Sequence, residues 1–267
     1  MEVLRYIALG FYLVALLGTL FYFRLHRLDR PTGLALVTVL ALFLAWGLQG
    51  IELGLAVTGG PAYGRPPDAF ELVAWVLAFS FLLVSLSARF FKASPLFLSA
   101  ILAFIGFSHT IGNRFPLSLE ASIQAGAWWG ELHILFFSLG FAVLTVTVLI
   151  GMLYVTKEWS LKHKRFAAME GIPPLDSLYV FFRLFLWVGF LLFTGGLLSG
   201  GGWSKILYGV YLSSDPKEYL TLVTWLLYAA AVNLQLLPSW RGRRTILLSY
   251  VAFALLVTSI VGVSHRI

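Results

Sequence analysis

The sequence contains no cysteine among its 267 residues. This excludes disulfides, thiol redox chemistry and cysteine-ligated metals within the chain, so a metal or cofactor would have to be held by His, Met, Tyr or carboxylates. Charged residues are also scarce, at 12%, where a soluble globular domain has about a quarter. The chain therefore has no room for a large soluble domain beside its apolar sequence.

Apolar residues make up most of the chain. Hydrophobic residues make up 60% of the chain and the mean hydropathy is +0.89. A membrane-crossing helix needs roughly 20 mainly apolar residues, and breaks such as Arg65-Pro66-Pro67 and Gly200-Gly201-Gly202 separate the runs. The predicted fold is an all-α polytopic membrane helix bundle, forming a single integral membrane domain over residues 1–267. The expected spans are about eight, at 3–23, 33–56, 70–88, 95–112, 128–156, 178–200, 219–237 and 244–264.

The distribution of basic residues predicts the orientation. The net charge is +7, but the Lys and Arg lie scattered between apolar runs, which excludes a nucleic-acid-binding patch. Most of them follow the first, third, fifth and seventh spans, so the positive-inside rule places these loops in the cytoplasm and both termini outside. The expected location is the cell (plasma or inner) membrane. The first apolar run, after Glu2 and Arg5, is expected to be a retained helix and not a signal peptide.

The five histidines fall into two groups on this topology. His26 and His163 lie in basic loops and are expected to be solvated. His109, His133 and His265 lie at similar depth near the outer face, and ionisable residues at membrane depth are costly and often functional. Since imidazole is a common axial ligand of haem iron, two of these His could hold haem from both faces. The alternative is that each His caps a helix end.

Aromatic and acidic residues near the outer face allow two interpretations each. The tryptophans fit an interfacial aromatic belt, and they would also suit the walls of a porphyrin pocket. The carboxylates are expected to be solvated at helix ends, and the alternative is that they line a proton or ion path. The residues are Trp128, Trp129 and Trp203, and Glu52, Glu71 and Glu131.

The second half of the chain carries a family pattern. From Trp128 it reads WWGELHILFFSLGFAVLTVTVLIGMLYV, and later segments read PLDSL from Pro174, TGG from Thr194, DPKE from Asp215 and LVTW from Leu222. In this order the segments resemble the cytochrome c assembly family, which includes the CcsA, CcmC and HemX-like membrane proteins. The resemblance is strongest over residues 120–265 and is nearest to the HemX-like branch.

The resemblance implies a protein that handles haem. Members bind haem non-covalently (b-type) near the outer face and present it to apocytochrome c, often beside a second membrane assembly subunit. No independent catalytic activity is implied. The resemblance makes His133 and His265 the axial ligands, with His109 in reserve, and the 200–218 loop a cover for the pocket. Further cofactor-binding candidates are Trp128, Trp129, Trp203, Asp215 and Glu218, of which the two acidic residues are expected to order the loop through helix-start hydrogen bonds.

Two departures from the family pattern keep alternatives open. Tyr208, Leu212 and Ser214 stand where haem-presenting members have Trp, and Asn233 stands where transporting members have a buried His. These losses point to the HemX-like branch. The alternative to haem handling is a HemX-like regulator of tetrapyrrole synthesis that acts through cytoplasmic loops, chiefly 157–177. A less favoured alternative is a secondary transporter whose path is lined by Glu52, Glu131 and Asn233.

Overall fold

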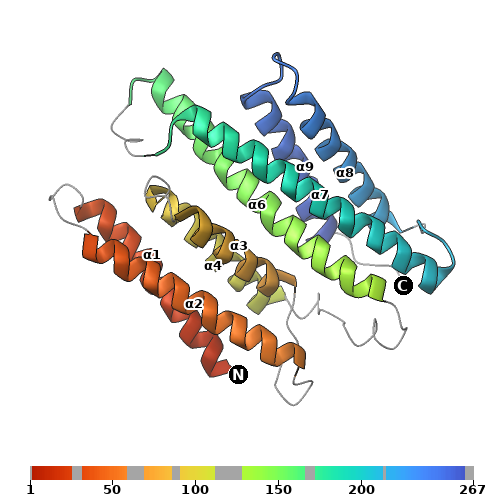
Figure 1. Ribbon diagram of the computed structural model, residues 1–267, viewed down its shortest axis with the longest axis horizontal. Coiled ribbons are helices and arrows are strands. Elements are labelled where there is room, and N and C mark those ends of the chain that lie inside the picture. Colours follow the sequence, from red (N-terminus) through yellow and green to blue (C-terminus); the bar gives the residue numbers. More distant parts are fainter. Residues whose placement is uncertain are drawn as a thin grey trace. The chain divides into compact units, whose positions relative to one another are not determined.

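The regular secondary structure in the described part of the protein is all helical. The structure is a computed structural model, and it describes residues 2–25, 32–58, 69–85, 91–111, 128–165, 172–212 and 215–261. These residues form eight α-helices and one short 3₁₀ helix, with no strand among them. Each α-helix coincides with one predicted span, so the predicted fold class is confirmed (Figure 1).

In chain order, the described elements are α1 (Glu2–Leu25), α2 (Thr32–Thr58), α3 (Ala69–Ser85), η2 (Phe91–Ala93), α4 (Ser94–Ile111), α6 (Trp128–Lys162), α7 (Leu175–Tyr208), α8 (Pro216–Leu234) and α9 (Arg243–Val261). Among the described residues, α1, α2, α6, α7 and α9 are the five helices long and apolar enough to cross a bilayer, while α3 and α4 are apolar but shorter. The protein is therefore a multi-pass membrane protein.

The first compact unit consists of Met1–Leu117 with Phe166–Pro173 and holds α1 to α4. In it α1 packs along α2 and against α4, and α3 packs against α4 (Figure 1). Tyr12, Phe81 and Phe97 are fully buried between these helices. Large apolar side chains on the outer surfaces of α1 and α2, such as Val3 and Leu36, are exposed, which is the arrangement that lipid contact requires.

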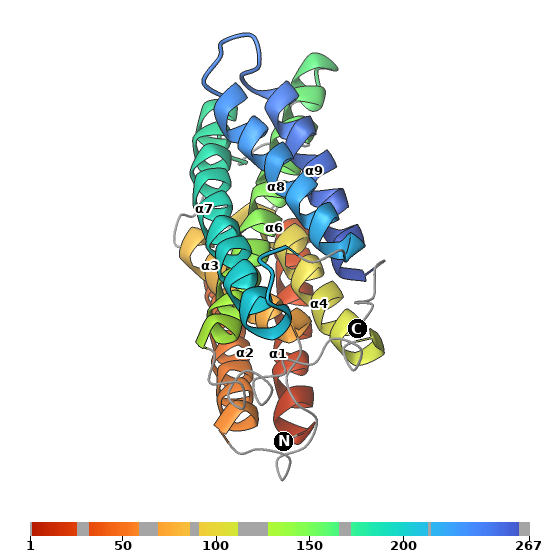
Figure 2. The ribbon, with the colours of Figure 1, turned by 90° about the vertical axis from the view of Figure 1, so that its right-hand side faces the viewer.

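The second unit consists of Ser118–Arg165 with Pro174–Ile267 and holds α6 to α9. Its two long helices, α6 and α7, pack along most of their length, α8 lies beside α9, and α9 also contacts α6 (Figure 2). Glycines allow the close approach of α6 and α7. A Cβ at Gly140 would lie 2.8 Å from the backbone nitrogen of Phe193, and small residues are the usual means of tight helix packing in membranes.

The structure corrects one predicted break. The Gly200–Gly202 triplet lies inside α7, which continues to Tyr208 and ends at Gly209 in the left-handed conformation, with φ 74. Much of the predicted 200–218 loop is therefore helix. The glycines serve packing and not a turn, because a Cβ at Gly200 or Gly202 would collide with side chains of α6. The helix α6 likewise runs on to Lys162 and shortens the predicted 157–177 loop. That the two units form a single membrane domain stays a prediction.

Candidate functional site

The side chain of His133 is held between the two longest helices. It lies on α6 near the helix start, and its Nδ1 is 2.7 Å from the carbonyl oxygen of Gly196 on α7. Because a carbonyl can only accept, the imidazole donates from Nδ1, and its lone pair lies on Nε2. Metal-binding histidines commonly have their second ring nitrogen fixed in this way, which sets both the tautomer and the ring orientation.

The three predicted tryptophans lie at this end of α6 and α7. The ring centroid of Trp203 is 6.1 Å from that of His133, at an interplanar angle of 39°. Trp129 lies against Gly202, where a Cβ would come within 2.9 Å of the indole. Trp128 stacks on Trp129 at 4.4 Å between centroids and is 58% exposed. The imidazole and the indoles therefore share one region of α6 and α7.

The indole of Trp203 carries a buried polar atom. The indole Nε1 of Trp203 makes no hydrogen bond within the described part of the chain. An unsatisfied buried donor costs about 1–3 kcal/mol. An acceptor on a bound molecule, such as a carboxylate, would remove that cost. Three groups therefore fit a planar, iron-containing ligand that carries carboxylates. They are the imidazole with its proton on Nδ1, the flat indole faces, and the indole N–H of Trp203, which could donate to a carboxylate.

Gly200 supplies the space that the His133 ring occupies. A Cβ at this position would lie 2.7 Å from Nδ1 of His133 and 2.9 Å from its Cε1. We expect Gly200→Ala to displace the imidazole and break its bond to Gly196. The affinity of His133 for a metal-containing ligand should then fall by about tenfold or more, as happens when a metal-binding His loses its supporting contact. Ligand titration followed by absorbance measures this.

The neighbouring glycine provides the control for that substitution. At Gly201 a Cβ would meet only the carbonyl oxygen of Tyr211, at an ordinary contact distance of 3.4 Å. Gly201→Ala adds the same methyl group to the same helix and should leave the titration unchanged. Equal effects of the two substitutions would show that Gly200 acts through helix stability and not through His133.

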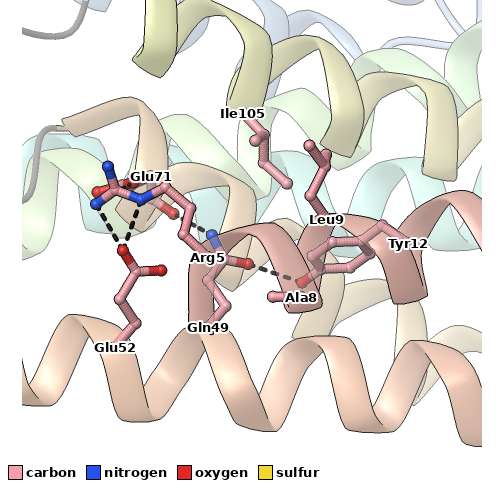
Figure 3. Close-up of a pocket in the computed structure, with 8 residues that line it drawn as sticks. All are labelled: Arg5, Ala8, Leu9, Tyr12, Gln49, Glu52, Glu71 and Ile105. Carbon is pink, nitrogen blue, oxygen red and sulfur yellow. Dashed lines mark hydrogen bonds and ion pairs between the residues drawn. The ribbon is translucent and has the colours of Figure 1, made fainter. Parts of the chain in front are cut away.

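A second polar cluster is buried inside the first unit (Figure 3). Arg5 on α1 lies between two carboxylates, with its guanidinium 2.6 Å from Glu52 of α2 and 3.0 Å from Glu71 of α3. Tyr12 donates to Gln49 at 2.8 Å, and Gln49 donates to the backbone oxygen of Glu71 at 3.2 Å. The cavity beside them has a volume of about 10 Å³, which is room for about one water.

This cluster corrects the prediction that Glu52 and Glu71 are solvated at helix ends. Each is only 3% exposed, and both bind Arg5, which the sequence suggested was an outer charge. Glu131, by contrast, is exposed on α6, as expected. The hydropathy pattern predicted how deep each Glu lies in the membrane, but it could not predict a partner on another helix.

Comparison with known proteins identifies the family. Residues 64–265 match the family described as cytochrome C assembly protein. The chain belongs to the cytochrome c assembly family. The cytochrome c biogenesis protein CcsA of Guillardia theta is 26% identical over 221 residues, which cover 74% of this chain and 71% of that one. CcsA of Synechococcus sp. (strain CC9605) is 40% identical over 77 residues, 29% of this chain and 25% of its own length.

A solved structure shares the fold of this cytochrome c assembly protein. The cytochrome c heme lyase CcmF matches 97% of this chain with a TM-score of 0.65 and 18% identity. The chain spans 45% of the length of that protein. At this level of identity the likeness concerns the arrangement of helices.

Several residues of the assembly-family pattern pack α7 against α8. The indole Nε1 of Trp225 donates to the hydroxyl of Thr194 at 2.9 Å, and its ring stacks on Phe190 at 5.7 Å. Asp215 is the N-cap of α8, and its carboxylate accepts from the backbone N–H of Lys217 at 2.9 Å. The expected helix-start bond of Asp215 is thus present. Glu218 lies in the first turn of α8, and its role at the cofactor stays a prediction.

The other histidines occupy separate positions. His265 and His26 lie outside the described residues, as does Ser214. His109 belongs to the first unit, is exposed on α4 and donates from Nδ1 to the carbonyl of Ile105 in its own helix at 2.8 Å, so its reserve role stays a prediction. His163 is exposed, as predicted for a solvated residue.

The remaining predicted positions are on the outside of the second unit. Tyr208 and Leu212, which replace family tryptophans, are 59% and 44% exposed. Asn233, which replaces a family His, is exposed and donates to the carbonyl of Ala229 at 2.7 Å. An exposed amide bonded to its own helix gives no support to a transport path through Asn233.

Proposed function

We propose that this protein binds haem and handles it during cytochrome c assembly, with His133 as one axial ligand. The observation that carries the proposal is the bond from Nδ1 of His133 to Gly196, since it fixes the tautomer in which Nε2 is the nitrogen able to ligate iron. His265 is the proposed second ligand, from the family pattern. Haem supplies an iron that accepts imidazole nitrogen at its axial positions.

Three features support a non-covalent, b-type haem. The chain has no cysteine, and c-type attachment needs cysteine thiols. The indole of Trp203 lies beside His133 and that of Trp129 lies against Gly202, and both offer flat faces to a porphyrin. The buried Nε1 of Trp203 lacks an acceptor within the described residues, and a haem propionate is a suitable one.

The proposed orientation places this site near the outer face of the cell membrane. His133 lies near the start of α6, and the basic residues Lys162, Lys164 and Arg165 lie at its other end, which the positive-inside rule assigns to the cytoplasm. At the outer end an exposed apolar stretch runs from Ile206 to Leu212. We assign to it the contact with apocytochrome c or a second membrane subunit.

The experiment is an absorption spectrum of the detergent-purified protein, oxidised and reduced. The expected result is a Soret band with the sharp bands of six-coordinate, low-spin haem after reduction, removable by acidified solvent because the haem is not covalently bound. A protein that carries no haem and takes up none on reconstitution would contradict the proposal. The HemX-like regulator of tetrapyrrole synthesis would then become the better proposal.

A further inference from the structure

The opposite end of the second unit contains a pocket that the haem proposal does not use. It lies between the last turns of α6 and the start of α9 and has a volume of about 230 Å³. Both helices belong to the same unit and pack together. The lining residues are Val155, Thr156, Glu158, Trp159, Lys162 and Arg243.

The pocket lies where apolar sequence gives way to charge. The apolar run of α6 ends at Val155, and that of α9 begins at Ile246, two residues after Arg244. Trp159 is 49% exposed at this level, and exposed tryptophans of membrane proteins concentrate at the headgroup region. The pocket therefore opens at the depth of lipid headgroups.

The charges around the pocket favour an anion. Lys162 and Arg243 contribute two cations, and Glu158 offsets one of them through its 2.7 Å ion pair with Lys162. No carboxylate pairs with Arg243 within the described ranges. Arg165 adds a further cation, 5.3 Å above the ring of Trp159. Excess positive charge beside an aromatic surface complements a phosphate that is attached to an acyl chain.

The walls of the pocket are fixed by two chain reversals. At the end of α6, Lys164 adopts φ 56 and Arg165 donates from its backbone N–H to Ser160 at 2.9 Å, the pattern of a Schellman cap. Before α9, Gly242 has φ 85, and a Cβ there would lie 3.1 Å from the hydroxyl of Tyr154 on α6. The residue before α9 thus lies close against α6, and the end of α6 has a defined cap.

We propose that this pocket binds the headgroup of an anionic phospholipid, with the phosphate between Lys162 and Arg243. The acyl chains would run along Trp159 and Val155 toward the membrane interior. The volume of about 230 Å³ is below the roughly 300–1,000 Å³ of complete small-molecule sites, so a headgroup fits it better than an entire soluble ligand. Basic pockets between membrane helices commonly hold such headgroups. The proposal is independent of haem binding.

The test is native mass spectrometry of the full chain in neutral detergent. Phosphatidylglycerol and phosphatidylcholine with identical acyl chains serve as probes. We expect the anionic lipid to be retained preferentially and Arg243→Gln to weaken its binding about fivefold, the effect of one basic residue at an anionic surface. The control is Arg244→Gln, which removes the same charge from the adjacent residue. The Arg244 side chain donates to the Ser239 carbonyl at 2.8 Å, away from the pocket, so its loss should change binding by less than about twofold.

Glu158→Gln gives a prediction of opposite sign. Within the described residues it removes the one carboxylate that lines the pocket, and it should tighten phosphatidylglycerol binding by about fivefold, a gain that a damaged fold would not produce. Equal retention of the two lipids, or equal losses for Arg243→Gln and Arg244→Gln, would overturn the proposal. Displacement of the lipid by millimolar inorganic phosphate would also overturn it, since the ligand would then be free phosphate.

Discussion

His133→Ala should remove most or all of the haem absorbance from the purified protein. The substitution deletes the imidazole whose Nδ1 proton is held by Gly196, and with it the nitrogen proposed to bind iron. Loss of supporting contacts to a metal-binding His alone costs about 10–100-fold in affinity, so loss of the ligand itself should exceed that range. Absorption spectra after haem titration, in both oxidation states, measure the effect.

Matched histidine substitutions separate ligation from general damage. His163→Ala changes an exposed residue directly after the end of the same helix and should leave the spectrum unchanged. His265→Ala should convert a six-coordinate spectrum to a five-coordinate one, whereas the same change produced by His109→Ala would make His109 the second ligand. A spectrum indifferent to His133→Ala would refute the proposed site.

Arg5→Leu should strongly destabilise the first unit. The side chains of Arg5, Glu52 and Glu71 are only 14%, 4% and 5% exposed, and removing one member of a buried ion-pair network costs about 3–5 kcal/mol because the remaining charge is left uncompensated. For a chain of this size the expected fall in melting temperature is about 10 °C. Thermal unfolding in detergent, followed by circular dichroism, measures it.

Two further variants test whether uncompensated charge is the cause. Combining Arg5→Leu with Glu52→Gln and Glu71→Gln removes all three charges and should restore most of the lost stability. Lys162→Gln breaks a pair in which Lys162 is 60% exposed, and exposed helix pairs contribute only about 0.3–0.5 kcal/mol. If Arg5→Leu and Lys162→Gln had equal effects, the buried cluster would have no special role in stability.

The sequence by itself determined the type and approximate bounds of the helices in the described part of the chain. Apolar runs of about 20 residues have few alternatives to helix in a bilayer, because every backbone polar group must be satisfied within its own segment. The order of motifs from Trp128 to Trp225 also identified the family. Local rules sufficed for the N-cap at Asp215, whose side chain bonds the backbone two residues on.

Only the tertiary structure decided which side chains meet. Glu52 and Glu71 have the sequence pattern of solvated helix ends, and their burial follows from Arg5, which lies on another helix. Gly200–Gly202 has the composition of a turn, yet it lies inside α7, where side chains of α6 leave no room for a Cβ at Gly200 or Gly202. The partner of His133 is a carbonyl 63 positions along the chain. Hydropathy reflects the free energy of transferring each side chain separately out of water. These contacts depend instead on how neighbouring helices pack.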